Sequence, residues 1–158
     1  MSFLNKWLSK FFPVKRGKII YNQLNQQVIQ LYHQGNYSQV IAVAEQVLEL
    51  ALTLWGENHP NVATSLHNLA GLYREVGRFA DAEPLSLQAL AMTRELLGEN
   101  HPDVAASLNN LAILFAATAR PREALSLMLP ASKIHDEMIR NLFSSGSETV
   151  FAPSVNKY

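Results

Sequence analysis

Apolar residues recur along this chain at intervals of three and four. In residues 61–76, and again in residues 103–118, they alternate with polar residues in this way. Such spacing places apolar side chains on one face of an α-helix. We therefore expect first helices near 18–34, 61–76 and 103–118, and second helices near 38–55, 79–97 and 121–143.

The pattern repeats with a period of 42 residues. The segment GENHPNVATSLHNLAGLYREVGRFADAEPL begins at Gly56, and GENHPDVAASLNNLAILFAATARPREALSL begins at Gly98. A weaker copy aligns upstream, where Gly35 matches Gly77. A gapless period of this length indicates stacked units that bury their apolar faces against their neighbours. We expect an all-α, right-handed α-solenoid of about three helix-turn-helix units, at residues 18–55, 56–97 and 98–139.

The two ends differ from the solenoid expected at residues 18–143. Residues 1–17 form a basic, amphipathic segment in which Pro13 ends an apolar helical stripe, and this stripe is either a cap on the first unit or an interfacial membrane helix. Residues 144–158 are rich in Ser and lack an apolar period, which predicts a flexible tail. The N-terminal stripe consists of Phe3, Leu4, Trp7, Leu8 and Phe11.

Polar residues and prolines mark the junctions between units. His59 and His101 each precede a proline, and this order predicts an N-cap followed by a proline in the first helical turn. Gly35 and Gly77 fall where each hairpin reverses, but Ala119 replaces glycine in the third unit. Pro130 also lies inside the last expected helix, so we expect the third unit to be the least regular.

Several of these repeated positions carry a family resemblance. The phrases HPDVAASLNNLA and GRFADAEPL are similar to the tetratricopeptide repeat, in the longer version found in kinesin light chain and its bacterial relatives. The resemblance implies a helical-hairpin solenoid that binds peptides or proteins. Ser86 departs from the pattern, because the family usually has an aromatic residue there. The matching residues are Leu66, Leu69, Ala70, Tyr73, Gly77, Ala82 and Ala89.

A second resemblance covers residues 134–151, IHDEMIRNLFSSGSETVF. This segment looks like the helix and SGSE turn that lead from such repeats into a caspase-like CHAT domain in bacterial multidomain proteins. The peptidase-like part is missing from the sequence. The resemblance implies a shortened relative, or the repeat half of a two-part system.

Charge is unevenly distributed although the formal net charge is zero. No acidic residue precedes Glu45, whereas five basic residues do, and such a segment favours an anionic membrane or protein surface. The zero net charge of the whole chain argues against general nucleic-acid binding. No apolar run approaches the roughly 20 residues of a membrane span, and we expect a cytoplasmic protein. The basic residues are Lys6, Lys10, Lys15, Arg16 and Lys18.

Catalytic and metal-binding chemistry finds no support in the residue pattern. The chain has no cysteine, which removes disulfides and thiol nucleophiles. No GxxxxGK[ST], GxGxxG or GxSxG motif occurs, and the histidines lack the spacing of metal ligands. We therefore expect no catalytic residue, no metal and no cofactor.

The polar faces of the first helices suggest a peptide groove. At 100° per residue, His67 and Asn68 point away from the apolar face of their helix, towards the inner curve. Amides can bond the backbone of an extended peptide, but they could equally be solvated or bonded to each other. Arg74 stands alone on this face, so a carboxylate clamp is not evident. The candidate peptide-binding residues are Asn25, Gln26, Ile29, His67, Asn68, Arg74, Asn109, Asn110 and Ile113.

These observations favour a non-enzymatic protein–protein interaction module. Two alternatives remain open: a membrane-surface scaffold anchored by the N-terminal stripe, and a regulatory repeat partner of a CHAT-type protease system. A homo-oligomer is also compatible with the sequence, because an uncapped solenoid end and an amphipathic helix can each self-associate.

Overall fold

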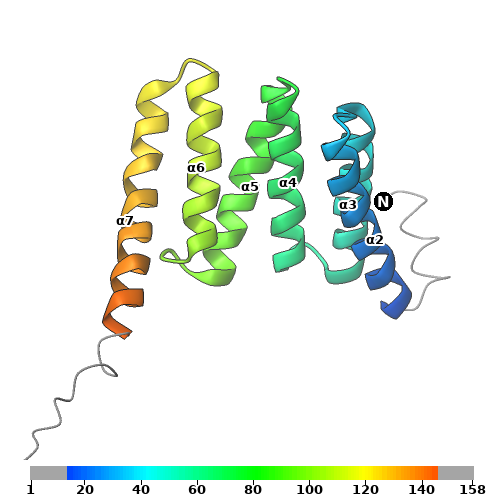
Figure 1. Ribbon diagram of the computed structural model, residues 1–158, viewed down its shortest axis with the longest axis horizontal. Coiled ribbons are helices and arrows are strands. Elements are labelled where there is room, and N and C mark those ends of the chain that lie inside the picture. The colour runs from blue at the N-terminus through cyan, green and yellow to red at the C-terminus, as the bar shows by residue number, and fades with distance from the viewer. Residues whose placement is uncertain (1–13, 146–158) are drawn as a thin grey trace, which may run out of the picture.

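Six helices stand in one row, as the computed structural model shows for residues 14–145, with side chains described for residues 16–141 (Figure 1). No strand occurs among these residues, so the prediction of an all-α solenoid is confirmed. The predicted N-terminal stripe and most of the predicted tail lie outside them. The helices are α2 (Val14–His33), α3 (Tyr37–Trp55), α4 (Pro60–Glu75), α5 (Phe79–Leu97), α6 (Pro102–Ala117) and α7 (Pro121–Ser145).

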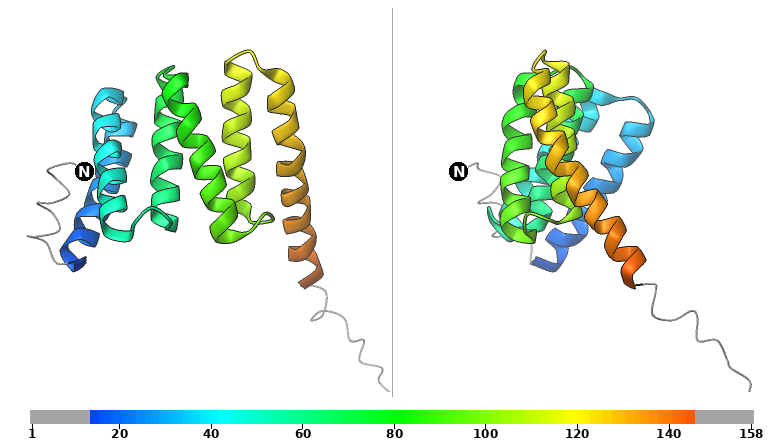
Figure 2. Two further views of the ribbon diagram at one scale, coloured as in Figure 1. Left: turned by 180° about the vertical axis from the view of Figure 1, so that it is seen from behind. Right: turned by 90° about the vertical axis from the view of Figure 1, so that its left-hand side faces the viewer.

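The helices pair into three hairpins, which we call units one (α2–α3), two (α4–α5) and three (α6–α7). Each hairpin packs on the next through α3 against α4 and α5 against α6, and α4 also contacts α6 directly. The view from behind shows the same order of helices (Figure 2). α2 begins four residues earlier than expected. Lys15, Arg16 and Lys18 favour a helix, but they are not apolar, so the apolar pattern used for the prediction did not include them.

Small residues recur where helices of one hairpin approach each other. Ala70, Ala82 and Ala89 of unit two are buried, and so are the residues 42 positions later, Ala112, Ala124 and Ala131. Alanine at these positions lets the helix backbones come close together, and larger neighbours fill the remaining space. The resulting core consists of two clusters, one from α2 to α5 and one from α3 to α7, and Leu108, Leu111 and Leu114 of the second cluster are among the most buried side chains.

Histidine caps two of the first helices, as the sequence predicted. The Nδ1 atom of His59 accepts a hydrogen bond from the Asn61 N–H at 3.1 Å, and that of His101 accepts one from the Asp103 N–H at 3.2 Å. Pro60 follows directly in the first turn of α4, where a missing N–H costs nothing. These two histidines therefore set the start of units two and three.

The turn of unit three keeps the conformation of the glycine turns. Ala119 has a φ of 59°, close to the 77° of Gly77, so alanine adopts a left-handed conformation that normally favours glycine. Arg120 beside it stabilises this end of the unit, because its guanidinium lies 3.9 Å from the Phe115 ring centre and 2.7 Å from a carboxylate oxygen of Glu83. The irregularity that the sequence predicted is absent from this turn, and α7 continues through Pro130.

Candidate functional site

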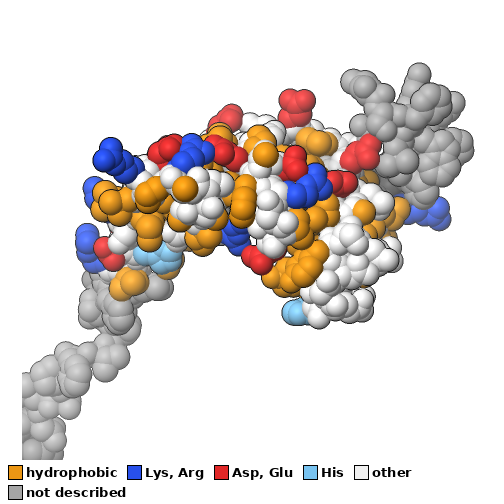
Figure 3. Space-filling view, turned by 90° about the horizontal axis from the view of Figure 1, so that it is seen from above, with side chains coloured by type: hydrophobic (Ala, Val, Ile, Leu, Met, Phe, Trp, Pro, Cys, Tyr) orange, Lys and Arg blue, Asp and Glu red, His pale blue; other side chains and the backbone are white. Residues whose placement is uncertain are grey.

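A groove of about 430 Å³ lies on the side of the solenoid where the first helices of the hairpins meet. Residues of all three units line it, so its shape depends on how the hairpins stack. Figure 3 shows this side at the bottom, where the molecule is hollowed beside unit one. We call it the inner groove. It is lined by Val28, Ile29, Tyr32 and His33 of α2, by His67, Asn68, Gly71, Leu72, Arg74 and Glu75 of α4, and by Asn110 of α6.

Two exposed apolar side chains of α2 line the inner groove: Ile29 is 50% exposed and Tyr32 is 42% exposed. On α6, Ile113 is 53% exposed and lies three residues after the groove residue Asn110. The Tyr32 ring stands edge-on to Tyr37, with ring centres 5.9 Å apart, which fixes its position at the rim. These side chains offer apolar surface to a ligand from two different units.

Asn110 connects α6 to α4 at the floor of the groove. Its Oδ1 accepts a long hydrogen bond from Arg74 Nη1 at 3.5 Å, and its Nδ2 lies 2.7 Å from His67 Nε2. Arg74 can only donate, so it directs the Asn110 carbonyl towards itself and the amino group towards His67. The His67 Nε2 atom is therefore the acceptor in this arrangement, and the proton is on Nδ1. Glu75 accepts a further bond from Arg74 at 3.1 Å.

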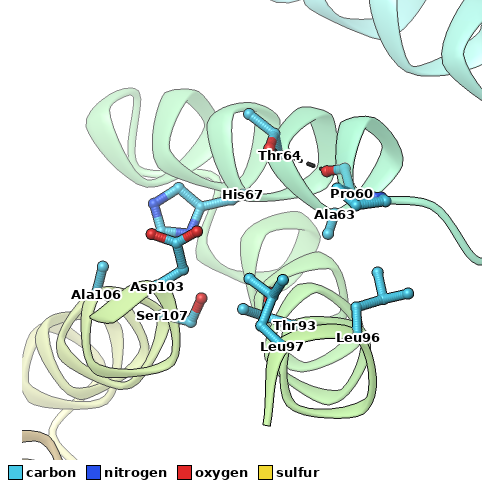
Figure 4. A pocket seen from close by; sticks show the side chains of 10 residues that line it. All are labelled: Pro60, Ala63, Thr64, His67, Thr93, Leu96, Leu97, Asp103, Ala106 and Ser107. Atoms are coloured by element: carbon cyan, nitrogen blue, oxygen red, sulfur yellow. Dashed lines mark hydrogen bonds between the residues drawn. The ribbon is translucent and has the colours of Figure 1, made fainter. Parts of the chain in front are cut away.

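His67 also lines a second, smaller pocket of about 190 Å³ between α4, α5 and α6. Figure 4 shows its ring beside the Asp103 carboxylate at one end of this pocket, with Leu96 and Leu97 at the other end. Burial lowers the pKa of His67 below its usual 6.5; Asp103 raises it in part, and Arg74 lowers it further. The neutral ring that results agrees with the hydrogen bond that Nε2 accepts from Asn110.

Acidification is expected to weaken the fold through His67. Because burial lowers its folded-state pKa, the unfolded chain binds the proton more readily than the folded chain does. Stability at this site is therefore complete above pH 6.5 and is lost as the pH falls from there towards the lower folded-state pKa. Urea unfolding on both sides of pH 6.5 would measure the loss in the natural chain and in His67→Gln.

The His67→Gln variant is the control, because it differs from the natural chain at this histidine alone. Its amide keeps an acceptor for Asn110 but has no proton to take up. We expect its stability to fall less on acidification than that of the natural chain. Equal losses in the two proteins would mean that His67 does not carry the pH dependence.

The predicted peptide-binding residues occupy different places. His67, Asn68, Arg74 and Asn110 come together in the inner groove with Ile29, and Ile113 is exposed nearby on α6. Asn25 is half-buried and donates to the Tyr21 carbonyl of its own helix at 2.9 Å. Gln26 lies in a separate hollow formed by α2 alone. Asn109 is half-buried on α6.

Sequence reasoning missed Tyr32, which supplies the aromatic surface of the groove. The residue 42 positions later is Arg74, and the next is Ala116, so the repeat gives no aromatic pattern at this position. The available signal was a lone tyrosine on the polar side of the first unit's helix. A bulky side chain on such a face is a candidate for contact with a ligand.

Three further expectations concern chemistry and membranes. In residues 14–145 no group of three or more His, Cys, Asp or Glu side chains is arranged to hold a metal ion. None of the helices that the structure describes is long and apolar enough to cross a membrane. The likeness of residues 134–151 to a linker before a CHAT domain stays a prediction, since α7 covers only its first part.

Comparison with known families gives one matching model, the tetratricopeptide repeat, over residues 22–95 and 65–135. Among curated proteins, nephrocystin-3 of Mus musculus is 43% identical over 51 residues, and that of Xenopus laevis is 41% identical over 51 residues. Each match spans 32% of this chain and 4% of the relative. The identity is thus confined to a short stretch of much longer proteins.

Solved structures show the same fold over most of the chain. BtubC (BKLC) of P. vanneervenii superposes with a TM-score of 0.70 at 20% identity, covering 88% of this chain and 52% of BtubC. A putative kinesin light chain of Podosopora anserina with nearly identical TPR-like repeats has a TM-score of 0.68 at 24% identity, covering 74% and 56%. The chain thus spans about half the length of these structures. At 20% and 24% sequence identity, the similarity to these structures establishes the fold of the chain and nothing further.

Proposed function

Because this chain belongs to the tetratricopeptide repeat family, we propose that it is a non-enzymatic module that binds an extended segment of a partner protein in the inner groove. The observation that carries the proposal is that three successive units line one groove with exposed apolar and polar side chains together. A groove of this composition suits a peptide, whose backbone is polar and whose side chains are spaced along it.

Different residues have different tasks in this mechanism. Asn68 is exposed and offers both a donor and an acceptor to a peptide backbone, which gives affinity without selecting a side chain. Ile29, Tyr32 and Ile113 cover apolar side chains of the peptide and supply selectivity. Asn110 and His67 are already bonded to each other, so they hold the floor of the groove in place.

Random peptides displayed on phage provide a probe that needs no known partner. A peptide selected on the natural chain would be synthesised with a fluorophore, and its binding measured by anisotropy. Asn68→Ala combined with Ile113→Ser should weaken binding at least about tenfold, because one backbone contact and one apolar contact are lost. Asn110 is left unchanged, because its removal would also disturb the contact between α4 and α6.

A matched double variant on the second helix of unit two serves as the control. Gln88→Ala with Leu87→Ser also removes one exposed amide and one exposed aliphatic side chain, but from α5. We expect its peptide affinity to equal that of the natural chain. If both double variants bind equally well, or if the control is the weaker one, the peptide does not use the inner groove.

A further inference from the structure

The first junction of the solenoid, between units one and two, is filled by a tyrosine. Tyr21 of α2 is buried there, and its ring stands edge-on to Trp55 of α3, with ring centres 4.9 Å apart. Its hydroxyl donates to the Asn61 carbonyl at 3.3 Å and lies 3.2 Å from the Ser65 Oγ atom. One side chain therefore joins α2, α3 and α4 through an aromatic ring and a hydroxyl group.

The second junction, between units two and three, lacks this side chain. The residue 42 positions after Tyr21 is Ala63, which has no ring to place between the helices. Ala63 lines the pocket of about 190 Å³ between α4, α5 and α6, together with Asp103 and Ser107. Asp103 and Ser107 lie 42 positions after the two residues that the Tyr21 hydroxyl contacts. The pocket is therefore the place that a tyrosine fills at the first junction, and we call it the junction pocket.

Ser107 gives the junction pocket an unused polar group. At the first junction, the equivalent Ser65 hydroxyl donates to the Asn61 carbonyl at 2.8 Å in addition to its contact with Tyr21. Ser107 is 4% exposed, and its hydroxyl bonds none of the described residues. Figure 4 shows this hydroxyl pointing into the pocket. Because a buried hydroxyl without a partner is costly, this position favours a ligand that can form a hydrogen bond.

The two ends of the junction pocket differ in chemistry. Leu96 and Leu97 form the apolar end, and the Asp103 carboxylate lies at the polar end beside His67 (Figure 4). Among the described residues, only His101 comes within ion-pairing distance of this carboxylate, at 3.7 Å. The same His101 nitrogen accepts a hydrogen bond from the Asp103 N–H, so it carries no proton. The negative charge at the pocket is therefore not compensated, which favours a hydrogen-bond donor and disfavours an anion.

We propose that the junction pocket binds a phenol group, with its ring at the apolar end and its hydroxyl between Ser107 and Asp103. The phenol oxygen accepts a hydrogen bond from Ser107, and its O–H donates to the Asp103 carboxylate. A phosphate or carboxylate in place of the hydroxyl is repelled by Asp103. The phenol belongs either to a small molecule or to a tyrosine of a partner protein. The pocket shares His67 with the inner groove, but this assignment does not depend on what the groove binds.

Titration with p-cresol, the tyrosine side chain as a free molecule, tests the proposal. Amide chemical shifts of the isotope-labelled full chain should report saturable binding at the junction pocket, with a dissociation constant of about 1 mM for so small a ligand. Ser107→Ala should weaken the binding of p-cresol about three- to tenfold, because one hydrogen bond is lost. Toluene has no hydroxyl group, so its affinity should be the same for both proteins.

Ser65→Ala is the matched control, because it removes the same side chain at the same position of the repeat. Ser65 lies at the first junction, which Tyr21 already fills, so p-cresol should bind this variant as it binds the natural chain. Ala63→Tyr places the tyrosine of the first junction in the second one. We expect this variant to unfold at a temperature no lower than the natural chain does and to lose the p-cresol site.

N-acetyltyrosinamide distinguishes the two sources of the phenol, because it carries the same ring on a peptide backbone. Binding at least as tight as that of p-cresol would identify the ligand as a tyrosine side chain, whereas binding of p-cresol alone would identify a small phenol. No saturable binding of either compound up to about 10 mM would overturn the proposal. So would equal weakening by Ser107→Ala and Ser65→Ala, or unchanged p-cresol binding in a folded Ala63→Tyr variant.

Discussion

Replacing Leu108 by alanine is expected to lower the free energy of unfolding by about 2–5 kcal/mol. This leucine is 1% exposed in the core cluster that runs from α3 to α7. Its removal leaves a cavity that the rigid helix pairs can close only in part, so the loss exceeds the transfer energy of the missing methyl groups. With three hairpins described, the solenoid has few other interfaces to compensate.

The same substitution in unit one provides the control. Leu24 is the residue two periods before Leu108, but it is only half-buried on α2. Leu24→Ala should therefore cost clearly less than Leu108→Ala. Urea unfolding followed by circular dichroism would measure both losses. Equal losses would mean that the position within the repeat, rather than burial, decides the contribution of the leucine.

The repeat made the architecture predictable from the sequence. A period of 42 residues assigns each apolar position to the same place in every unit, so one recognised helix pair predicts the others. The buried alanines and the histidine caps follow the same rule, since both are local consequences of backbone geometry. Ala119 was harder, because alanine was not expected to hold the φ of 59° that it adopts.

The candidate site was predictable only in part, because its contacts cross between units. Helical spacing placed His67 and Asn110 on the same face, but it could not show that their side chains lie 2.7 Å apart. That contact depends on the distance between α4 and α6 and on both rotamers. Asn25 was assigned to the same row, yet it bonds its own helix at Tyr21 instead. Unit one is the most divergent copy of the repeat. The 42-residue period alone therefore assigns its residues to the inner face less reliably than it does for the other two units.

Ala70 and its neighbour Gly71 should respond to enlargement in opposite ways. Ala70 is 3% exposed where α4 packs, so Ala70→Leu must push helices apart or strain its rotamer, at a cost of about 1–3 kcal/mol. A Cβ atom added at Gly71 meets nothing within 4 Å. Gly71→Ala should therefore stabilise α4 by about 0.5–1 kcal/mol, because alanine loses less conformational freedom in a helix than glycine does.

Comparing these two variants separates packing from helix propensity within one turn of α4. The midpoint of thermal unfolding should be lower for Ala70→Leu, and higher for Gly71→Ala, than for the natural chain. If both variants were destabilised, the groove beside Gly71 would be more tightly packed than the structure shows. If neither changed, α4 would not be held by close packing at Ala70, and the buried alanines 42 residues apart would need another explanation. If α4 is close-packed at Ala70 and open at Gly71, the two variants must change the unfolding midpoint in opposite directions.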